Sequence, residues 1–146
     1  MTLQRMDNVG IVVDDLKAAI AFFTELGLEL EGEGRVEGTF ADQCVGLDGV
    51  SCDIAMMRVP DGPGRLELAK YLSPVAGPMT PQRPPHNLVG MHRVMFTVTG
   101  IEDVVDRLRP YGGELVGEIA RYGDTTKVCY VRGPGEIFVG LAEYLT

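Results

Sequence analysis

Hydrophobic and polar residues alternate in two stretches of the chain that lie far apart in the sequence. Apolar side chains fill every second position at Val9, Ile11 and Val13, and again at Val94, Phe96 and Val98. A period of two places successive side chains on opposite faces, which is typical of a strand with one buried face. We therefore predict a β-strand in each stretch.

Apolar residues with helical spacing follow each predicted strand. They are Leu16, Ala19, Ile20 and Phe23 in the first stretch, and Ile101, Val104, Val105 and Leu108 in the second. The spacing i, i+3, i+4, i+7 forms one face of an α-helix. Asp14 or Asp15 is expected to cap the first helix and Thr99 the second, because a side-chain oxygen there accepts a hydrogen bond from a free amide. Gly27 and Gly112 suit the left-handed residue that ends a helix.

The two stretches are copies of one pattern. Residues 6–32 and 91–117 share identical residues at aligned positions, which are Met6/Met91, Val9/Val94, Val13/Val98, Gly27/Gly112, Glu29/Glu114, Leu30/Leu115 and Gly32/Gly117. Their last strands also match, as "RLELAKYL" (65–72) and "FVGLAEYL" (138–145). Two further strands are predicted in each copy, near 38–45 and 52–58 in the first and near 114–121 and 127–131 in the second. Each copy is therefore predicted to be a βαβββ module.

The segment 73–90 separates the two copies and contains five prolines, which are not compatible with a central strand. We predict one domain over residues 1–146, made of a module at 6–72, the proline-rich linker at 73–90 and a module at 91–145. The predicted fold class is α+β. Two βαβββ modules would form a curved eight-strand sheet, a partial barrel, with helices outside and a cup for a small molecule inside.

The duplicated pattern, with "NVGIVVDDLKAAIAFFTELGLEL" near the start and "RGPGEIFVGLAEYL" near the end, resembles the vicinal oxygen chelate superfamily. This superfamily includes glyoxalase I, methylmalonyl-CoA epimerase, extradiol dioxygenases, and bleomycin- and fosfomycin-resistance proteins. The resemblance extends from about residue 6 to residue 145 and implies the fold described above. It does not determine the activity, because one scaffold supports many chemistries.

The resemblance also implies the positions of a site. In metal-dependent members the four ligands come from the first and last strands of each module, and the matching positions here are Asn8, Glu67, Arg93 and Gly140. Arginine has no lone pair to donate and carries a fixed positive charge, and glycine has no side chain. We therefore expect no metal and no other cofactor, with a divalent metal as the runner-up. His92 is one residue away from the matching position, so it should face the other side of its strand.

Glu67 and Arg93 are the predicted catalytic residues if the protein is an enzyme, which the sequence leaves open. We expect them to face each other across the cup. Glu67 would remove a proton alpha to a carbonyl group, and Arg93 would stabilise the enolate oxygen in place of a metal. A purely structural ion pair is the competing explanation. The predicted ligand-binding residues are Asn8, Glu67, Arg93, Met95, Tyr71 and Tyr130, although such side chains also suit a plain core.

The predicted function is to bind a small oxygenated metabolite, a carbonyl compound or a carboxylate, with metal-independent proton transfer as an open possibility. One alternative is a metal-dependent lyase or isomerase, such as lactoylglutathione lyase or methylmalonyl-CoA epimerase, that uses Glu67 and His92. Another is a non-catalytic protein that sequesters a drug, in the manner of the bleomycin-resistance proteins.

Composition narrows the possible partners and location. A net charge of −8 argues against binding to nucleic acid. The sequence has no apolar run of about 18 residues and no signal-peptide pattern, so we expect a cytoplasmic protein that does not enter membranes. Cys44, Cys52 and Cys129 form no CxxC motif and are expected to be reduced and buried. The resemblance implies a homodimer.

Overall fold

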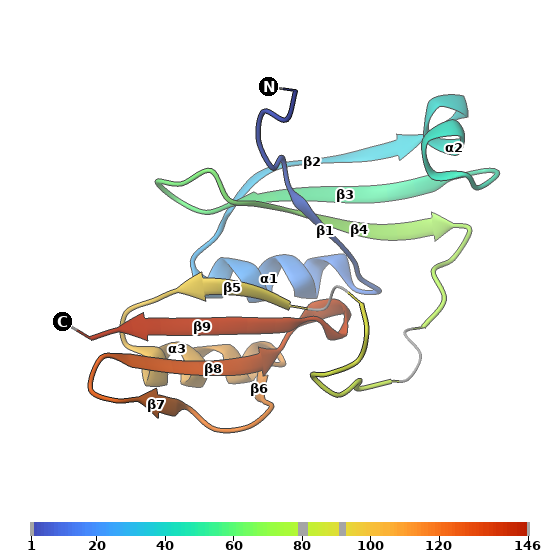
Figure 1. Ribbon diagram of the computed structural model, residues 1–146. Coiled ribbons are helices and arrows are strands. Elements are labelled where there is room, and N and C mark those ends of the chain that lie inside the picture. The colour runs from blue at the N-terminus through green and yellow to red at the C-terminus, as the bar shows by residue number, and fades with distance from the viewer. Residues whose placement is uncertain (1, 79–81, 91–92, 146) are drawn as a thin grey trace. The chain divides into compact units, whose positions relative to one another are not determined.

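The structure is a computed structural model that describes residues 2–78, 82–90 and 93–145. The chain divides into two compact units, residues 1–77 and 78–146, and the boundary falls within the predicted linker. Each unit contains its own sheet and its own long helix (Figure 1). The units are described one after the other.

The first unit has the order β1, α1, β2, α2, β3, β4. These elements are β1 (Val9–Val12), α1 (Leu16–Leu26), β2 (Glu29–Glu37), α2 (Thr39–Val45), β3 (Ser51–Arg58) and β4 (Arg65–Ser73). The sheet order is β1-β4-β3-β2, with β1 parallel to β4 and the other pairs antiparallel. Helix α1 packs across β2, β3 and β4, and its Phe22 and Phe23 are fully buried together with Leu68 of β4.

The second unit also begins with a strand and a helix followed by strands, but within residues 93–145 it has no counterpart of α2 and has one more short strand. Its elements are β5 (Arg93–Thr97), α3 (Ile101–Leu108), a 3-10 turn (Arg109–Tyr111), β6 (Glu114–Leu115), β7 (Ala120–Tyr122), β8 (Thr126–Arg132), a 3-10 turn (Pro134–Glu136) and β9 (Phe138–Tyr144). The sheet order is β5-β9-β8-β6, and β7 also pairs with β8. Helix α3 packs on β9 and β6 and lies behind the sheet in Figure 1.

The α+β class and the repeated βαβββ order are confirmed. The strand pairing also repeats, because Gly10 lies opposite Glu67 in the first unit and Met95 lies opposite Gly140 in the second. These are the positions that the sequence alignment of the two copies places together. The described strands form one sheet of four strands and one of five, and a curved sheet that spans both modules stays a prediction.

The strand predicted near 38–45 is wrong, because this segment forms helix α2. Ala41 of this helix is buried against the small core of Val50, Cys52 and Ala69. The Asp42 carboxylate accepts hydrogen bonds from the backbone amides of Gly49 (3.0 Å) and Val50 (2.8 Å), which ties the helix to the following loop. The strand that takes the predicted place beside β3 is β2, which begins shortly after the end of α1.

The strand predicted at 114–121 is two separate strands, β6 and β7. Gly117 lies in the gap between them, and glycine weakens a strand because it has no side chain to pack. The other predicted strands agree with β3, β4, β8 and β9 to within about two residues.

The two long helices begin in different ways. Asp15 caps α1 as expected, since its carboxylate accepts a hydrogen bond of 3.0 Å from the Ala18 amide. The predicted Thr99 cap of α3 is wrong, because the N-cap position is Gly100, with a φ of 68°. The Glu143 carboxylate of β9 accepts the hydrogen bonds from the Gly100 amide (2.7 Å) and the Ile101 amide (3.1 Å) instead. These two bonds lower the pKa of Glu143, because they stabilise its charged form.

Candidate functional site

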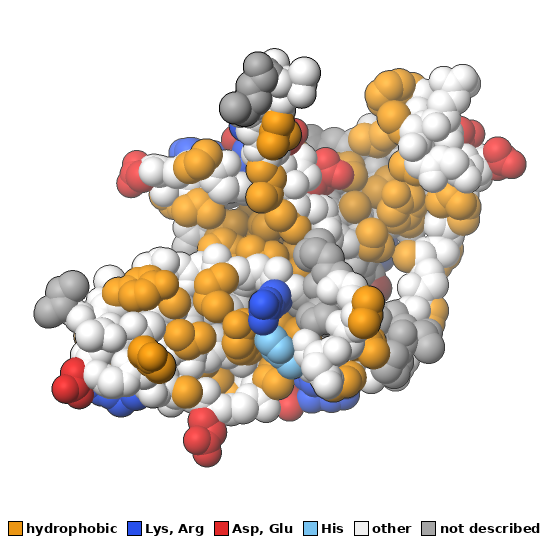
Figure 2. Space-filling model, in the orientation of Figure 1, with side chains coloured by type: hydrophobic (Ala, Val, Ile, Leu, Met, Phe, Trp, Pro, Cys, Tyr) orange, Lys and Arg blue, Asp and Glu red, His pale blue; other side chains and the backbone are white. Residues whose placement is uncertain are grey.

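One face of the second unit's sheet is turned away from α3, and we call it the open face. Val131 marks the opposite face, since a Cβ on Gly113 would contact both Val131 and Leu108 of α3. Side chains alternate along β8, so Tyr130 and Arg132 belong to the open face. The strand pairing arranges this face in three rows, which are Arg93–Phe138–Arg132, Met95–Gly140–Tyr130 and Thr97–Ala142–Val128. Figure 2 shows hydrophobic side chains gathered over β5, β9 and β8.

Arg93 stands at the exposed edge of the open face. Its guanidinium carbon lies 5.9 Å from the centroid of the Tyr130 ring, within the range of a cation–π interaction. Within the described part of the second unit, no carboxylate forms an ion pair with Arg93. Within its own unit the charge of the guanidinium group is therefore not neutralised by a carboxylate.

Met95 and Tyr130 stand on either side of Gly140 in the next row. A Cβ added to Gly140 would lie 2.7 Å from Met95 Sδ and 3.0 Å from Tyr130 Cε1. Both distances are too short for real contacts, so the two side chains fill the space above this glycine. The structure thus brings together Arg93, Met95 and Tyr130, three of the predicted ligand-binding residues.

The end of the linker packs on the same face. The ring centroid of His86 lies 4.4 Å from that of Tyr130 and 4.9 Å from that of Phe138. Arg132 donates a hydrogen bond of 2.9 Å to the Pro84 carbonyl and lies over the Phe138 ring at 5.0 Å. The linker segment 82–90 is thus part of the candidate site. Sequence reasoning gave His86 no role, because the linker has no periodicity that would predict its contacts.

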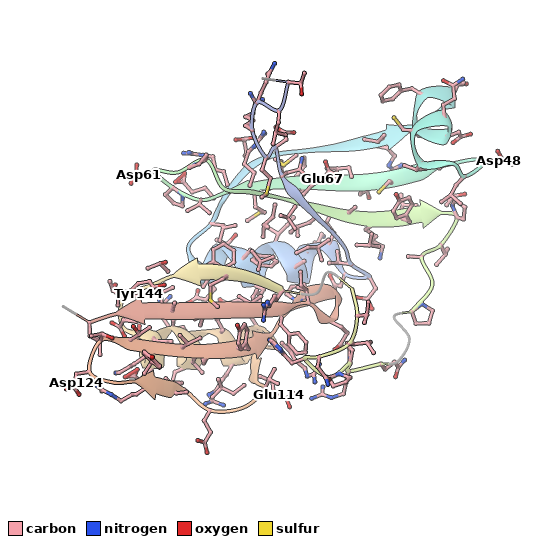
Figure 3. The ribbon with its side chains drawn as sticks, viewed as in Figure 1. Asp48, Asp61, Glu67, Glu114, Asp124 and Tyr144 are labelled. Atoms are coloured by element: carbon pink, nitrogen blue, oxygen red, sulfur yellow. The ribbon has the colours of Figure 1, made fainter. Side chains whose placement is uncertain are left out.

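Glu67 lies on β4 of the first unit (Figure 3). Lys70 on the same strand reaches the Asp14 carbonyl at the start of α1, so Glu67, three residues away, faces away from that helix. Its neighbours in the sheet are Gly10 and Met56. Among the described residues Glu67 forms no hydrogen bond and no ion pair.

Tyr71 and Asn8, the remaining predicted residues of the first unit, have different surroundings. Tyr71 packs against the small core beneath α2, which gives it a structural role. Asn8 precedes β1, is half-buried, and donates a hydrogen bond of 3.3 Å to the Asp7 carboxylate. Burial raises the pKa of the Cys52 thiol, and the charge of Glu67 adds to the effect. Glu67 and Arg93 belong to different units, so their facing each other across a cup stays a prediction.

The four residues that match the family's metal ligands do not fit a metal ion. Asn8 offers a neutral amide, Glu67 one carboxylate, Arg93 a fixed positive charge and Gly140 no donor at all. Among the described residues no three His, Cys, Asp or Glu side chains come together as a metal site. His92 lies outside the described residues, so its predicted orientation is untested.

The cysteines agree in part with expectation. Cys44, Cys52 and Cys129 are all free thiols, and Cys52 and Cys129 are buried. Cys44 is exposed, so its expected burial is wrong; it lies on α2, the segment that was predicted to be a strand. Burial raises the pKa of Cys129 to about 11. Of the helices described, none has the length and apolar character needed to cross a membrane.

Comparisons with solved structures support the fold. A glyoxalase family protein from Bacillus cereus is 46% identical, with a TM-score of 0.93, and the match covers 100% of this chain and 97% of that one. A glyoxalase/dioxygenase from Nostoc punctiforme is 15% identical, with a TM-score of 0.68 and coverage of 99% and 94%. An antibiotic binding protein from a Streptomyces species is 16% identical, with a TM-score of 0.59 and coverage of 99% and 98%.

No functionally curated protein gives a significant match to the chain. The family model of the Glyoxalase/Bleomycin resistance protein/Dioxygenase superfamily matches residues 5–141. This range covers the first βαβββ module, the linker and the second module as far as Leu141 in β9, and it includes Asn8, Glu67, Arg93 and Gly140. The chain therefore belongs to the Glyoxalase/Bleomycin resistance protein/Dioxygenase superfamily.

Proposed function

We propose that the protein binds a small organic carboxylate on the open face of its second unit. The observation that carries this proposal is the setting of Arg93, an exposed guanidinium group beside an aromatic ring with no ion-pair partner in the described part of its unit. A planar guanidinium group pairs with a carboxylate through two parallel hydrogen bonds. Arg93 therefore holds the charged end of the ligand.

The rest of the open face suits an apolar ligand body. Met95 is 46% exposed and Tyr130 is half-buried, so both offer apolar surface next to Arg93. Methionine adapts its shape to different ligands, and an aromatic ring provides a flat surface. Binding of a small molecule is also what the name of the Streptomyces protein states, an antibiotic binding protein of the same fold. The ligand class we propose is a carboxylate with an apolar or aromatic body.

Ligand-induced thermal stabilisation tests this proposal. Benzoate and phenylacetate should raise the Tm of the wild-type protein in a concentration-dependent way, while the neutral analogue benzamide should not. Arg93→Ala should abolish the shift. Arg93→Lys should reduce it, because lysine keeps the charge but not the planar pair of donors.

Arg121→Ala is the matched control. Arg121 is an exposed arginine of β7 in the same unit, so its removal changes the net charge equally. This variant should keep the full stabilisation by benzoate. If Arg93→Ala and Arg121→Ala respond to benzoate as the wild type does, the proposal is wrong.

Proton transfer is a second candidate function, favoured by the carboxylate of Glu67, which has no hydrogen bond or ion pair among the described residues. In this version Glu67 removes a proton alpha to the carbonyl group of its ligand. Exchange of that proton for deuterium in D₂O, followed by NMR with an α-keto acid such as pyruvate, measures this step. Glu67→Gln should stop the exchange. If the wild-type protein shows no exchange above the rate in buffer, the proton-transfer function is wrong and only the binding function remains.

Metal content separates these proposals from the metal-dependent alternative. The donor set of Asn8, Glu67, Arg93 and Gly140 suits no transition metal. We therefore expect purified protein to contain far less than one equivalent of any such metal. A stoichiometric metal ion that survives dialysis would favour the metal-dependent lyase or isomerase instead.

A further inference from the structure

In the row Met95–Gly140–Tyr130, the side chains of Met95 and Tyr130 occupy the space above Gly140. A Cβ on Gly140 would lie 2.7 Å from Met95 Sδ, 2.9 Å from Met95 Cε and 3.0 Å from Tyr130 Cε1. Among the described residues, Gly140 is not one of the glycines with positive φ. The need for glycine at this position therefore comes from the space above it, which the Met95 thioether occupies.

We infer that Met95 is a specificity-determining residue, whose thioether closes the space above Gly140 and limits how large a ligand body fits beside Arg93. This inference rests on the proposed function, because it concerns the ligand that Arg93 holds. Arg93 and Met95 are two positions apart on β5 and point to the same face. A ligand whose carboxylate is bound by Arg93 must place its body over Met95 or Tyr130.

The exposure of Met95 means that this position can be changed without damage to the core. Its side chain is 46% exposed, whereas Phe138 in the neighbouring row is fully buried. Shortening a side chain at such a surface position leaves no cavity in a core, in contrast to shortening one that is packed inside. Shortening it should thus leave the fold intact and expose the backbone of Gly140 and the edge of the Tyr130 ring.

Ligand size is the first test. In wild-type protein benzoate should bind more tightly than 2-naphthoate, with both affinities measured by calorimetry. Met95→Ala should shift the ratio of the two affinities toward 2-naphthoate by about tenfold, because the larger ring system gains buried apolar surface. Met95→Leu fills the same space without sulfur and should keep the wild-type ratio. An unchanged ratio in Met95→Ala would overturn the inference.

Steric coupling is the second test and does not depend on any ligand. Gly140→Ala should lower the Tm of the wild-type protein, and the loss should be smaller when Met95 is already alanine, because two of the three close contacts are then gone. Equal losses in both backgrounds would mean that Met95 does not occupy this space, and would overturn the inference.

The two tests separate this inference from the proposed function. If Arg93→Ala abolishes binding but Met95→Ala leaves the ratio of affinities unchanged, the inference fails and the proposed function stands. If Arg93→Ala has no effect on benzoate binding, the proposed function fails. The inference about ligand size then fails with it, even if the coupling between Met95 and Gly140 is found.

Discussion

The two units place a glycine and a large side chain at exchanged positions. In the first unit Gly10 of β1 pairs with Glu67 of β4, and a Cβ on Gly10 would meet no atom within 4 Å. In the second unit Met95 takes the position of Gly10, and Gly140 takes the position of Glu67. Each pair thus consists of one glycine and one long side chain, but the side chain comes from the opposite strand.

This exchange teaches that the duplicated modules conserve their pairing and not their chemistry. The glycine leaves open space around a carboxylate in the first unit, whereas the thioether closes the corresponding space in the second. Arg93 and Tyr130 then make the open face basic and aromatic. Matching positions in the two modules therefore carry unlike side chains.

The largest loss of stability is expected from substitutions in the hydrophobic cores of the two units, which should be equivalent. Leu68 and Leu141 occupy matching positions, and neither is exposed at all. Leu68→Ala and Leu141→Ala should each lower the free energy of unfolding by about 2–5 kcal/mol, because each leaves a cavity. Urea denaturation measures this, with Leu30→Ala, at a position 42% exposed, as a control of small effect. A large loss for only one leucine would break the equivalence of the cores.

The next effect concerns the segment that covers each sheet opposite its long helix. Helix α2 covers part of the first sheet, and the Asp42 carboxylate secures the loop that follows it. The linker segment 82–90 covers part of the second sheet, and Arg132 secures it through the Pro84 carbonyl. Asp42→Ala and Arg132→Met should each cost about 1–3 kcal/mol, because each removes charged hydrogen bonds.

Limited proteolysis distinguishes the two variants of the covering segments. Arg132→Met should speed cleavage within residues 82–90 and leave α2 protected, whereas Asp42→Ala should do the opposite. If either variant is cleaved equally in residues 82–90 and in α2, each segment is not held in place by its own hydrogen bonds.

A smaller effect, with a clear pH dependence, is expected from the helix caps. Glu143 has a lowered pKa in the folded protein because of its two backbone hydrogen bonds. Its contribution to stability is therefore full above the pKa of the unfolded chain and is lost as the pH falls through the lower, folded pKa. Glu143→Gln should lower the Tm by a few degrees at neutral pH, and thermal unfolding at several pH values should show this difference disappear in acid.

Asp15→Ala provides the comparison in the first unit. Removal of this cap should cost about 0.5–2 kcal/mol at neutral pH, since the Ala18 amide loses its partner.

Glutamine keeps an acceptor oxygen at position 143 but not the charge. A Tm difference for Glu143→Gln that stays constant down to strongly acidic pH would contradict the electrostatic explanation.

The smallest effect is chemical and does not involve stability. Cys44 is exposed, while Cys52 and Cys129 are buried with raised pKa values. A thiol reacts as the thiolate, so one cysteine should react rapidly with a disulfide reagent at neutral pH and all three only after unfolding. Cys44→Ser should remove the rapid phase. Rapid reaction of a second thiol would show that one of the two buried positions opens readily.

Much of the fold was predictable because the chain carries the same periodic signal twice. The alternation at Val9, Ile11 and Val13 and its copy at Val94, Phe96 and Val98 depend on local burial, which sequence periodicity reports well. The segment 39–45 was mispredicted because it is a single short helix whose only buried contact, Ala41, is with residues distant in sequence. The cap of α3 was missed for the same reason, since Glu143 is far from Gly100 along the chain.

The candidate site was predictable only where it lies on repeated strands. Arg93, Met95 and Tyr130 follow from strand alternation and alignment of the copies, and the structure brings them together. The contact of His86 with Tyr130 was not predictable, because His86 lies in a proline-rich segment without the periodicity from which the direction of a side chain can be predicted. The close fit between Met95 and Gly140 was likewise hidden, since alignment marks Gly140 as a missing ligand and gives no sign that the space is filled.

The cap supplied by Glu143 also has a consequence for the order in which the units fold. Helix α1 carries its cap at Asp15, so its first turn is stabilised as soon as the neighbouring residues are synthesised. Helix α3 has only eight residues and takes its cap from Glu143 of β9, 42 residues after Ile101 in the sequence. Short helices are unstable alone in water. We therefore expect the first turn of α1, whose cap is local, to form earlier in folding than that of α3, whose cap requires β9 to be in place.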